Sequence, residues 1–261
     1  MNENEIYEQI KNSRKYKDLS KEIIIKEIRE YIKRNPNYKE YKKKRILKEI
    51  KANLHKIYGS FQLKRKKLRE NYLKERNFEA ILTTNLSTKE RLKVYKKLYE
   101  LIFSVTGKPK SILDLGAGIN PLSIIYMKDV NIKNLKYYAY DINEANVNLV
   151  NDFFRIKGMQ GRAQIIDLSK IENIKKLPYA DICFMFKIID PLEKGKGHKL
   201  SEKIIKILKC KYIVASFATK TLSGRKMRHP YRGWIERMLD RNRFEWKKIN
   251  TENEVFYIIK K

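Results

Sequence analysis

The second half of the chain alternates short apolar runs with helical stretches, and this pattern constrains the fold more than any other feature of the sequence. Strands that alternate with helices form a parallel sheet through right-handed crossovers, with helices on both faces. The predicted strands cover residues 111–115, 136–141, 162–167, 181–187, 211–217, 243–249 and 254–259. The predicted helices between them lie near 121–130, 143–158, 198–209 and 231–241.

The last two predicted strands break this alternation. Residues 250–253 alone separate them, which is too short a connection for a crossover helix, so the two strands form an antiparallel hairpin at one edge of the sheet. Such an ending is typical of class I methyltransferases rather than of dinucleotide-binding domains. We therefore predict an α/β, Rossmann-like class I methyltransferase fold with a seven-stranded, mostly parallel sheet and a terminal antiparallel hairpin.

The first half of the chain carries helical signals alone. Ser20 is a good N-cap residue, and residues 87–90 have the capping-box pattern Ser-Thr-Lys-Glu. We predict an all-helical N-terminal domain over residues 1–106 and the sheet domain over residues 107–261. The helices expected in the first domain cover residues 20–34, 38–58, 62–75 and 87–106.

A large excess of positive charge points to a polyanionic partner. The 261 residues include 60 Lys and Arg against 30 Asp and Glu, a formal net charge of +30. Self-repulsion of this size destabilises a compact protein unless an anion compensates it. Residues 41–78 hold 14 basic against 3 acidic side chains, and residues 218–248 hold 10 against 3. One such segment in each half favours a shared RNA- or DNA-binding face over a solvated, lysine-rich surface.

Several protein classes are excluded. The longest apolar runs, such as 182–186, are far shorter than the roughly 18 residues that cross a bilayer, and the N-terminus lacks the apolar core of a secretory signal. Cys183 and Cys210 are the only cysteines, which fits a reducing compartment, and no Cys/His pair has the spacing of metal ligands. We predict a cytoplasmic monomer with no membrane partner and no metal.

The connection after the first predicted strand has the features of a ligand-binding loop. Gly116 and Gly118 allow a tight turn and close approach of a ligand, at the carboxyl edge of the sheet where open α/β folds bind ligands. Asp141 ends the next strand, where a carboxylate can accept both hydroxyls of a ribose; the alternative is a cap of the following helix. Asp167 and Leu168 end the third strand, in position to bond an adenine amine and pack on its ring, or to form a plain loop.

The loop favours S-adenosylmethionine over NAD. Pro121 stands where the dinucleotide fingerprint has its third glycine, and Asp114 within the loop suits the ammonium of a methionine moiety rather than a pyrophosphate. Methyl transfer from a sulfonium is an in-line displacement that depends mainly on alignment. A ring nitrogen such as guanine N7 carries a lone pair and no proton, so it requires no general base. Lys187, at the end of the fourth strand, can bond a base edge or a phosphate, or extend to solvent.

Several segments together resemble the aminoglycoside-resistance 16S rRNA methyltransferases of the ArmA, Rmt and FmrO type, which methylate guanine N7 in the decoding-site helix of the small ribosomal subunit. The similarity covers nearly the whole chain. The matching segments are Leu54-His55-Lys56-Ile57-Tyr58-Gly59, Ser87-Thr88-Lys89-Glu90-Arg91, residues 113–122, Tyr140-Asp141-Ile142, residues 217–225, and Trp234 with Glu236.

The resemblance implies roles for individual residues. It implies that the helical domain docks on 16S rRNA, that Arg91 binds the methionine carboxylate, and that Gly116 and Asp141 hold the cofactor. Lys187, from its place at the end of the fourth strand, is the catalytic candidate. The cofactor-binding set is Ser87, Arg91, Asp114, Gly116, Gly118, Asp141, Asp167 and Leu168. The RNA-binding set, after the fifth strand, is Lys220, Arg225, Lys226 and Arg228.

Three alternatives stay open. Pro191 is displaced by one residue from the family's Lys-x-x-Pro turn, so another rRNA base, methylated at an adenine ring nitrogen, is one alternative target. A second alternative is a ribosome-assembly factor that keeps the fold and the basic face without catalysis. An NAD-linked oxidoreductase is the third, and Pro121 and the terminal hairpin disfavour it.

Overall fold

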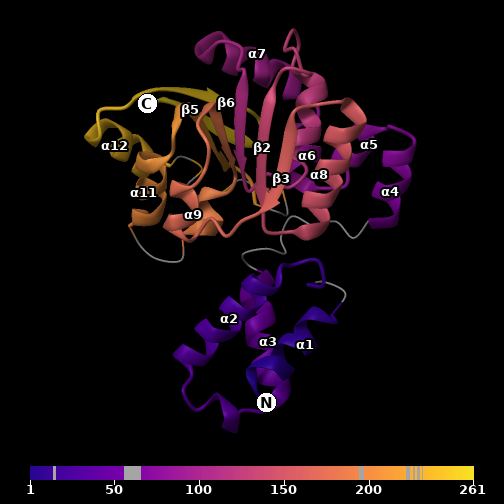
Figure 1. The fold of residues 1–261 in the computed structure, drawn as a ribbon. Coiled ribbons are helices and arrows are strands. Elements are labelled where there is room, and N and C mark those ends of the chain that lie inside the picture. Colours follow the sequence, from indigo (N-terminus) through magenta and orange to yellow (C-terminus); the bar gives the residue numbers. More distant parts are fainter. Residues whose placement is uncertain are drawn as a thin grey trace.

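The computed structural model describes residues 1–13, 16–55, 66–193, 197–221, 224–225, 227, 230 and 232–261. Its centre is a seven-stranded sheet (Figure 1). The strands are β1 (Ser111–Leu115), β2 (Lys136–Asp141), β3 (Gly161–Ile165), β4 (Ala180–Phe186), β5 (Cys210–Ala218), β6 (Glu245–Asn250) and β7 (Glu254–Lys260), in the order β3-β2-β1-β4-β5-β7-β6. All neighbours are parallel except β7, which is antiparallel to both β5 and β6. The predicted fold class and terminal hairpin are confirmed.

Helices cover both faces of the sheet, because alternate residues of each buried strand point to opposite faces. Ile112 and Phe184 contribute to the core on one face, and Leu113 and Met185 to the core on the other. The first face is covered by α5 (Phe78–Leu82), α7 (Tyr95–Thr106), the 3₁₀ helix η3 (Asn120–Tyr126) and α8 (Glu144–Lys157). The second is covered by α9 (Ile171–Lys175), α11 (Lys199–Ile207) and α12 (Gly233–Arg241).

The first three helices have a hydrophobic core of their own. They are α1 (Glu3–Lys11), α2 (Lys21–Arg34) and α3 (Lys43–Leu54), with the short 3₁₀ turn η1 (Tyr38–Glu40) between the last two. Ile24, Ile28 and Ile50 are fully buried among them, and Figure 1 shows this three-helix unit below the body of the sheet. The hydrophobic core of the three-helix unit is therefore separate from that of the sheet region, to which α4 (Lys66–Lys74) and the later helices contribute. The domain boundary after residue 106 stays a prediction.

The helix expected over residues 87–106 is divided in two. Asn85, not Ser87, is the N-cap: its side chain accepts a hydrogen bond from the Ser87 amide at 3.0 Å, and α6 (Leu86–Arg91) follows. The chain turns at residues 92–94 before α7 begins. The predicted capping box was therefore wrong by two residues. The consequence is a short helix that presents Ser87, Glu90 and Arg91 toward the sheet.

The other predicted helices differ mainly at their ends. The second begins at Lys43, after η1, and the segment expected to continue it to residue 58 lies outside the described residues from 56 onward. The helix after β1 is a 3₁₀ helix that begins with Asn120 and Pro121. In the described ranges, no helix combines the length and the apolar character that crossing a lipid bilayer requires.

The separate core of the three-helix unit gives a test of the fold. Ile50→Ala should lower the stability of this unit by about 3 kcal/mol, because the substitution removes buried methylene groups and leaves a cavity. Native-state hydrogen exchange should show the loss in α1–α3 and little change in α8. Lys48→Ala, at an exposed position of the same helix, is the matched control. An equal loss of protection throughout the sheet would contradict the separation of the cores.

Candidate functional site

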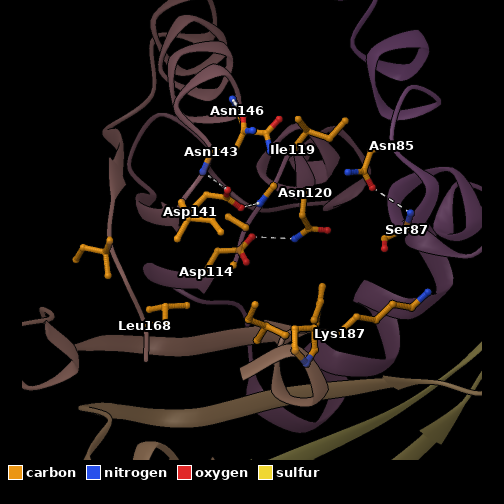
Figure 2. A pocket seen from close by; sticks show the side chains of 18 of the residues that line it. Asn85, Ser87, Asp114, Ile119, Asn120, Asp141, Asn143, Asn146, Leu168 and Lys187 are labelled. Carbon is orange, nitrogen blue, oxygen red and sulfur yellow. Dashed lines mark hydrogen bonds between the residues drawn. The ribbon is translucent and has the colours of Figure 1, made fainter. Parts of the chain in front are cut away.

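A cavity lies at the carboxyl edge of the sheet, where the loops after β1, β2, β3 and β4 meet (Figure 2). Residues from α6 and from the segment before α2 complete its wall. The lining includes Leu19, Asn85, Ser87, Arg91, Asp114, Gly116, Gly118, Asn120, Asp141, Asp167, Leu168, Lys187 and Ile188. The structure thus brings together all eight residues of the predicted cofactor set and the predicted catalytic candidate.

The glycine loop forms a tight floor for this cavity. Gly116 has a φ of +66° and Gly118 a φ of +54°, backbone angles that residues other than glycine rarely adopt. A Cβ atom on Gly116 would lie 2.6 Å from the side chain of Ile188, another lining residue. Any side chain at position 116 would therefore push Ile188 and narrow the cavity.

Asp114 is a buried carboxylate at one end of the cavity. Its Oδ2 accepts hydrogen bonds from Asn120 Nδ2 at 2.9 Å and from the Tyr137 hydroxyl at 2.8 Å. Burial raises the pKa of Asp114 to about 6, against the opposing effect of these two donors. A cation bound beside Asp114 would offset part of the free-energy cost of burying its charge.

Asp141 binds the backbone at the end of β2. Its Oδ2 accepts the Gly118 amide and its Oδ1 the Asn143 amide, each at 2.7 Å. Burial raises the pKa of Asp141 although these amides stabilise the charged form. Asn143, and not Asp141, is the N-cap of α8, with its side chain accepting from the Asn146 amide. Asp141 therefore joins the glycine loop to the next strand at the wall of the cavity.

Asp167 and Leu168 form the wall after β3. Leu168 is buried and faces the cavity in Figure 2. The Asp167 carboxylate accepts hydrogen bonds from Lys26 Nζ at 2.8 Å and from the Ser169 amide at 3.0 Å. Burial would raise the pKa of Asp167, but Lys26 and Ser169 outweigh that effect and lower it. This carboxylate therefore stays ionised within reach of the cavity.

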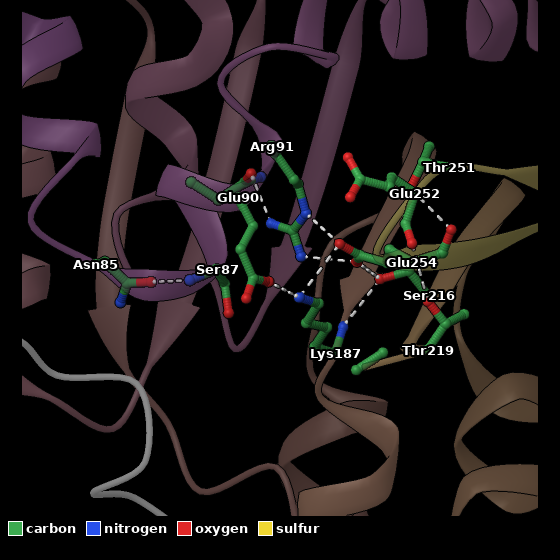
Figure 3. Close-up of polar contacts among 12 residues, drawn as sticks. Asn85, Ser87, Glu90, Arg91, Lys187, Ser216, Thr219, Thr251, Glu252 and Glu254 are labelled. Carbon is green, nitrogen blue, oxygen red and sulfur yellow. Dashed lines mark hydrogen bonds and ion pairs between the residues drawn. The ribbon is translucent and has the colours of Figure 1, made fainter. Parts of the chain in front are cut away.

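A network of buried charges borders the opposite side of the cavity (Figure 3). Arg91 donates from Nε and Nη2 to the two carboxylate oxygens of Glu254, at 2.9 and 2.8 Å, while its Nη1 lies 3.5 Å from Asn120 Oδ1. Lys187 Nζ bonds Glu90 at 2.6 Å and lies 3.5 Å from Glu254 Oε2. The side chains of Arg91, Lys187 and Glu254 are all less than 10% exposed.

Glu254 is the centre of this network. Burial would raise its pKa, but Arg91 and Lys187 outweigh that effect and lower it. The hydroxyl of Ser216 donates to the same carboxylate, and the Lys187 amide donates to that hydroxyl at 3.0 Å. Lys187 itself has a φ of +54° at the end of β4. Lys187, predicted to bond a base edge or a phosphate or to extend to solvent, is held by two carboxylates in the structure.

Sequence reasoning missed Glu254, Glu90 and Lys26. Glu254 precedes an otherwise apolar run, Val-Phe-Tyr-Ile-Ile, and an acidic residue at the start of a buried strand was a usable signal. Glu90 was interpreted only as a capping residue. Nothing in the local pattern around Lys26 marks it, because its partner Asp167 is 141 positions away in the chain.

The predicted RNA-binding set is only partly described. Lys220 Nζ bonds Glu252 at 2.7 Å, and Arg225 is exposed. Lys226 and Arg228 lie outside the described residues.

The chain resembles known proteins in its sequence and in its fold. A sequence model of the family described as "Ribosomal RNA methyltransferase (FmrO)" matches residues 12–258. A 16S rRNA (guanine(1405)-N(7))-methyltransferase of Proteus mirabilis is 29% identical over 187 residues, 69% of this chain and 63% of that protein. The corresponding protein of Frankia casuarinae is 24% identical over 185 residues, 69% of this chain and 62% of the relative. The alignment thus spans less than two thirds of the length of these relatives.

Solved structures share the fold over the full chain. The crystal structure of the 16S rRNA methyltransferase RmtF in complex with S-adenosyl-L-homocysteine has a TM-score of 0.84 at 24% identity, covering 100% of this chain and 99% of that one. The 16S rRNA methylase RmtB has a TM-score of 0.81, with the same identity and coverage. Because the family model covers nearly the whole sequence, the chain belongs to the ribosomal RNA methyltransferase (FmrO) family.

Proposed function

We propose that this protein is an S-adenosylmethionine-dependent methyltransferase that modifies guanine N7 in the decoding-site helix of 16S rRNA. It acts as a monomer in the cytoplasm, on the small ribosomal subunit. The observation that carries the proposal is the cavity at the carboxyl edge of the sheet, in which a glycine loop and three carboxylates meet. The names of the relatives, 16S rRNA (guanine-N7)-methyltransferases, support the choice of substrate.

The lining of the cavity fits the three parts of this cofactor. The desolvated carboxylate of Asp114 would bind the ammonium group, and Arg91 Nη1, which does not contact Glu254, would bind the carboxylate beside Ser87. Asp141 would bind the ribose, and Asp167 with Leu168 the adenine amine and ring. Gly116 and Gly118 would allow the backbone to approach the ligand closely.

S-adenosylmethionine supplies a methyl group on a sulfonium, which is already a strong electrophile. Guanine N7 offers a lone pair in the plane of the ring, so the protein need not remove a proton and its main contribution is alignment. Lys187, held by Glu90 and Glu254 at the cavity wall, would orient the base edge or its phosphate. The two ion pairs fix the position of the Lys187 ammonium group, which suits a role in orienting the substrate.

The basic segments would bind the RNA backbone. We propose that the helical residues 1–106 form the docking domain, and that Lys220, Arg225, Lys226 and Arg228 contact RNA near the target base. Lys220 is paired with exposed Glu252, and a phosphate would replace that partner at little cost. Affinity for the small subunit should therefore fall steeply with salt.

The activity can be tested on small subunits that lack the modification. We expect methyl transfer from radiolabelled S-adenosylmethionine, and strand cleavage at one guanine after borohydride and aniline treatment, mapped by primer extension. A mark on an adenine would select the alternative target, and small-subunit binding without any methyl transfer would select the assembly factor.

Asp141→Ala separates catalysis from binding to the subunit. It removes the acceptor of two backbone amides at the cavity wall, so affinity for S-adenosylhomocysteine should fall at least about tenfold. Methyl transfer should disappear while binding to the small subunit persists. Asp152→Ala, on the outer surface of α8, is the matched control and should leave both unchanged.

Asp114→Asn should raise the stability of the folded protein and weaken its binding of the ligand. The folded pKa near 6 lies above the ordinary value near 4, so the folded state holds the proton more tightly and stability falls as the pH rises between these values. The neutral amide of Asn does not titrate, so this effect disappears. We expect the free energy of unfolding at pH 7 to rise by about 1–2 kcal/mol and to depend less on pH. Thermal melts from pH 4 to 8 measure both, and calorimetry should show weaker binding of S-adenosylhomocysteine. A loss of stability at pH 7 would contradict this account.

Glu254→Gln should destabilise the protein strongly. It leaves the buried cations of Arg91 and Lys187 without their shared carboxylate, a change that costs about 3 kcal/mol or more. Glu252→Gln, two positions earlier and 81% exposed at its side chain, should leave the urea midpoint unchanged, because solvent screens its ion pair with Lys220. Equal urea midpoints for the two variants would show that the buried network contributes nothing.

A further inference from the structure

The three-helix unit supplies part of the cavity wall. Leu19, just before α2, lines the cavity, and its backbone forms a β-bridge with Asn143, another lining residue. The Glu144 amide donates to the Asp18 carbonyl at 3.0 Å, and the Ser20 amide to the Ile142 carbonyl at 3.4 Å. The backbone of the N-terminal region is therefore joined to the end of β2, where the ribose-binding carboxylate Asp141 is proposed to act.

One side chain of this unit reaches the far end of the cavity. Lys26, on α2, bonds Asp167 Oδ2 at 2.8 Å and also the hydroxyl of Ser169. Its side chain is 22% exposed and that of Asp167 is 7% exposed, so solvent screens the ion pair only weakly. Within the described ranges, Lys26 is the cation that pairs with Asp167.

These contacts fix the Asp167 carboxylate from two sides. Lys26 occupies Oδ2, whereas the amide and the hydroxyl of Ser169 both donate to Oδ1, the hydroxyl at 2.6 Å. An ionised carboxylate can accept about four hydrogen bonds, so this one keeps acceptor capacity for a ligand. Without Lys26, the Ser169 contacts alone would leave Oδ2 unpaired in a poorly solvated position.

We propose that Lys26 is a positioning residue for the adenine end of the cofactor: from the three-helix unit, it holds the Asp167 carboxylate oriented to accept a hydrogen bond from a purine 6-amino group. This inference rests on the proposed function, since it requires an adenosyl ligand in the cavity. Because Lys26 belongs to α2, ligand binding at Asp167 and attachment of the three-helix unit to the sheet favour each other reciprocally.

The inference is tested by comparing two ligands in calorimetry. S-adenosylhomocysteine carries the 6-amino group, and S-inosylhomocysteine carries a carbonyl oxygen at that position, which a carboxylate repels. We expect the wild-type protein to prefer the first ligand by about tenfold or more. Lys26→Met should weaken the adenosyl ligand by about tenfold and the inosyl ligand by less than about twofold, so that the preference disappears.

Three further variants separate positioning from a general structural effect. Lys26→Arg keeps the charge and should retain the preference, and Lys33→Met, at an exposed position of the same helix, should match the wild type. In the Asp167→Asn background, Lys26→Met should change the ratio of the two affinities by less than about twofold, because its effect passes through Asp167. Should Lys26→Met lose its folded signal in circular dichroism, Lys26→Gln takes its place.

The outcomes distinguish this inference from the proposed function. An unchanged preference in Lys26→Met, or an equal loss of affinity for both ligands, would overturn the positioning role while leaving the proposed activity intact. A wild-type protein that binds both ligands equally would also overturn it. If the wild-type protein binds neither ligand, the proposed function itself fails.

Discussion

The pairing of Arg91 with Glu254 joins the parts of the molecule on which the site depends. Arg91 ends the short helix α6, Glu254 begins β7, and the two lie 163 positions apart in the chain. Neither charge could stay buried without the other, because an isolated buried ion costs several kcal/mol. The pair therefore fixes α6 against the antiparallel edge of the sheet. That placement puts Asn85, Ser87 and Arg91 into the cavity wall.

The same principle gives the three carboxylates of the cavity different properties. Asp114 has two neutral donors as partners, and burial raises its pKa, whereas Asp167 has a lysine, which lowers it. Asp141 is held by backbone amides and takes part in the structure of the loop itself. A ligand with a cationic group at one end and a hydrogen-bonding purine at the other would suit these differences in pKa between the carboxylates. The environments of these groups, more than their identity, distinguish the two ends of the site.

The sequence predicted the sheet well because buried parallel strands have a strong local signal. All seven strands lie within about two residues of their predicted positions, and the hairpin was expected from the short connection at residues 250–253. The glycine loop and the carboxylates at strand ends were found for the same reason, since strand ends of a parallel sheet meet at one edge. The helix ends were harder to predict: Asn85 and Ser87 are both good N-cap residues, and local propensity alone does not decide which of the two begins the helix.

Charge pairs between residues distant in the sequence could not be predicted in this way, although several of them hold residues of the cavity wall. Lys187 was expected to bond a base edge or a phosphate, or to extend to solvent, and its ion pairs with Glu90 and Glu254 were not foreseen. Lys26 had no local signal. The Lys187–Glu90 and Lys26–Asp167 pairs each join the sheet region to a segment of the helical half of the chain. The protein carries a net charge of +30, and two of its buried acidic groups, Glu254 and Asp167, have basic partners that are distant in the sequence. The surplus of lysine and arginine thus also supplies buried side chains, such as Arg91 and Lys187, that hold the walls of the cavity together.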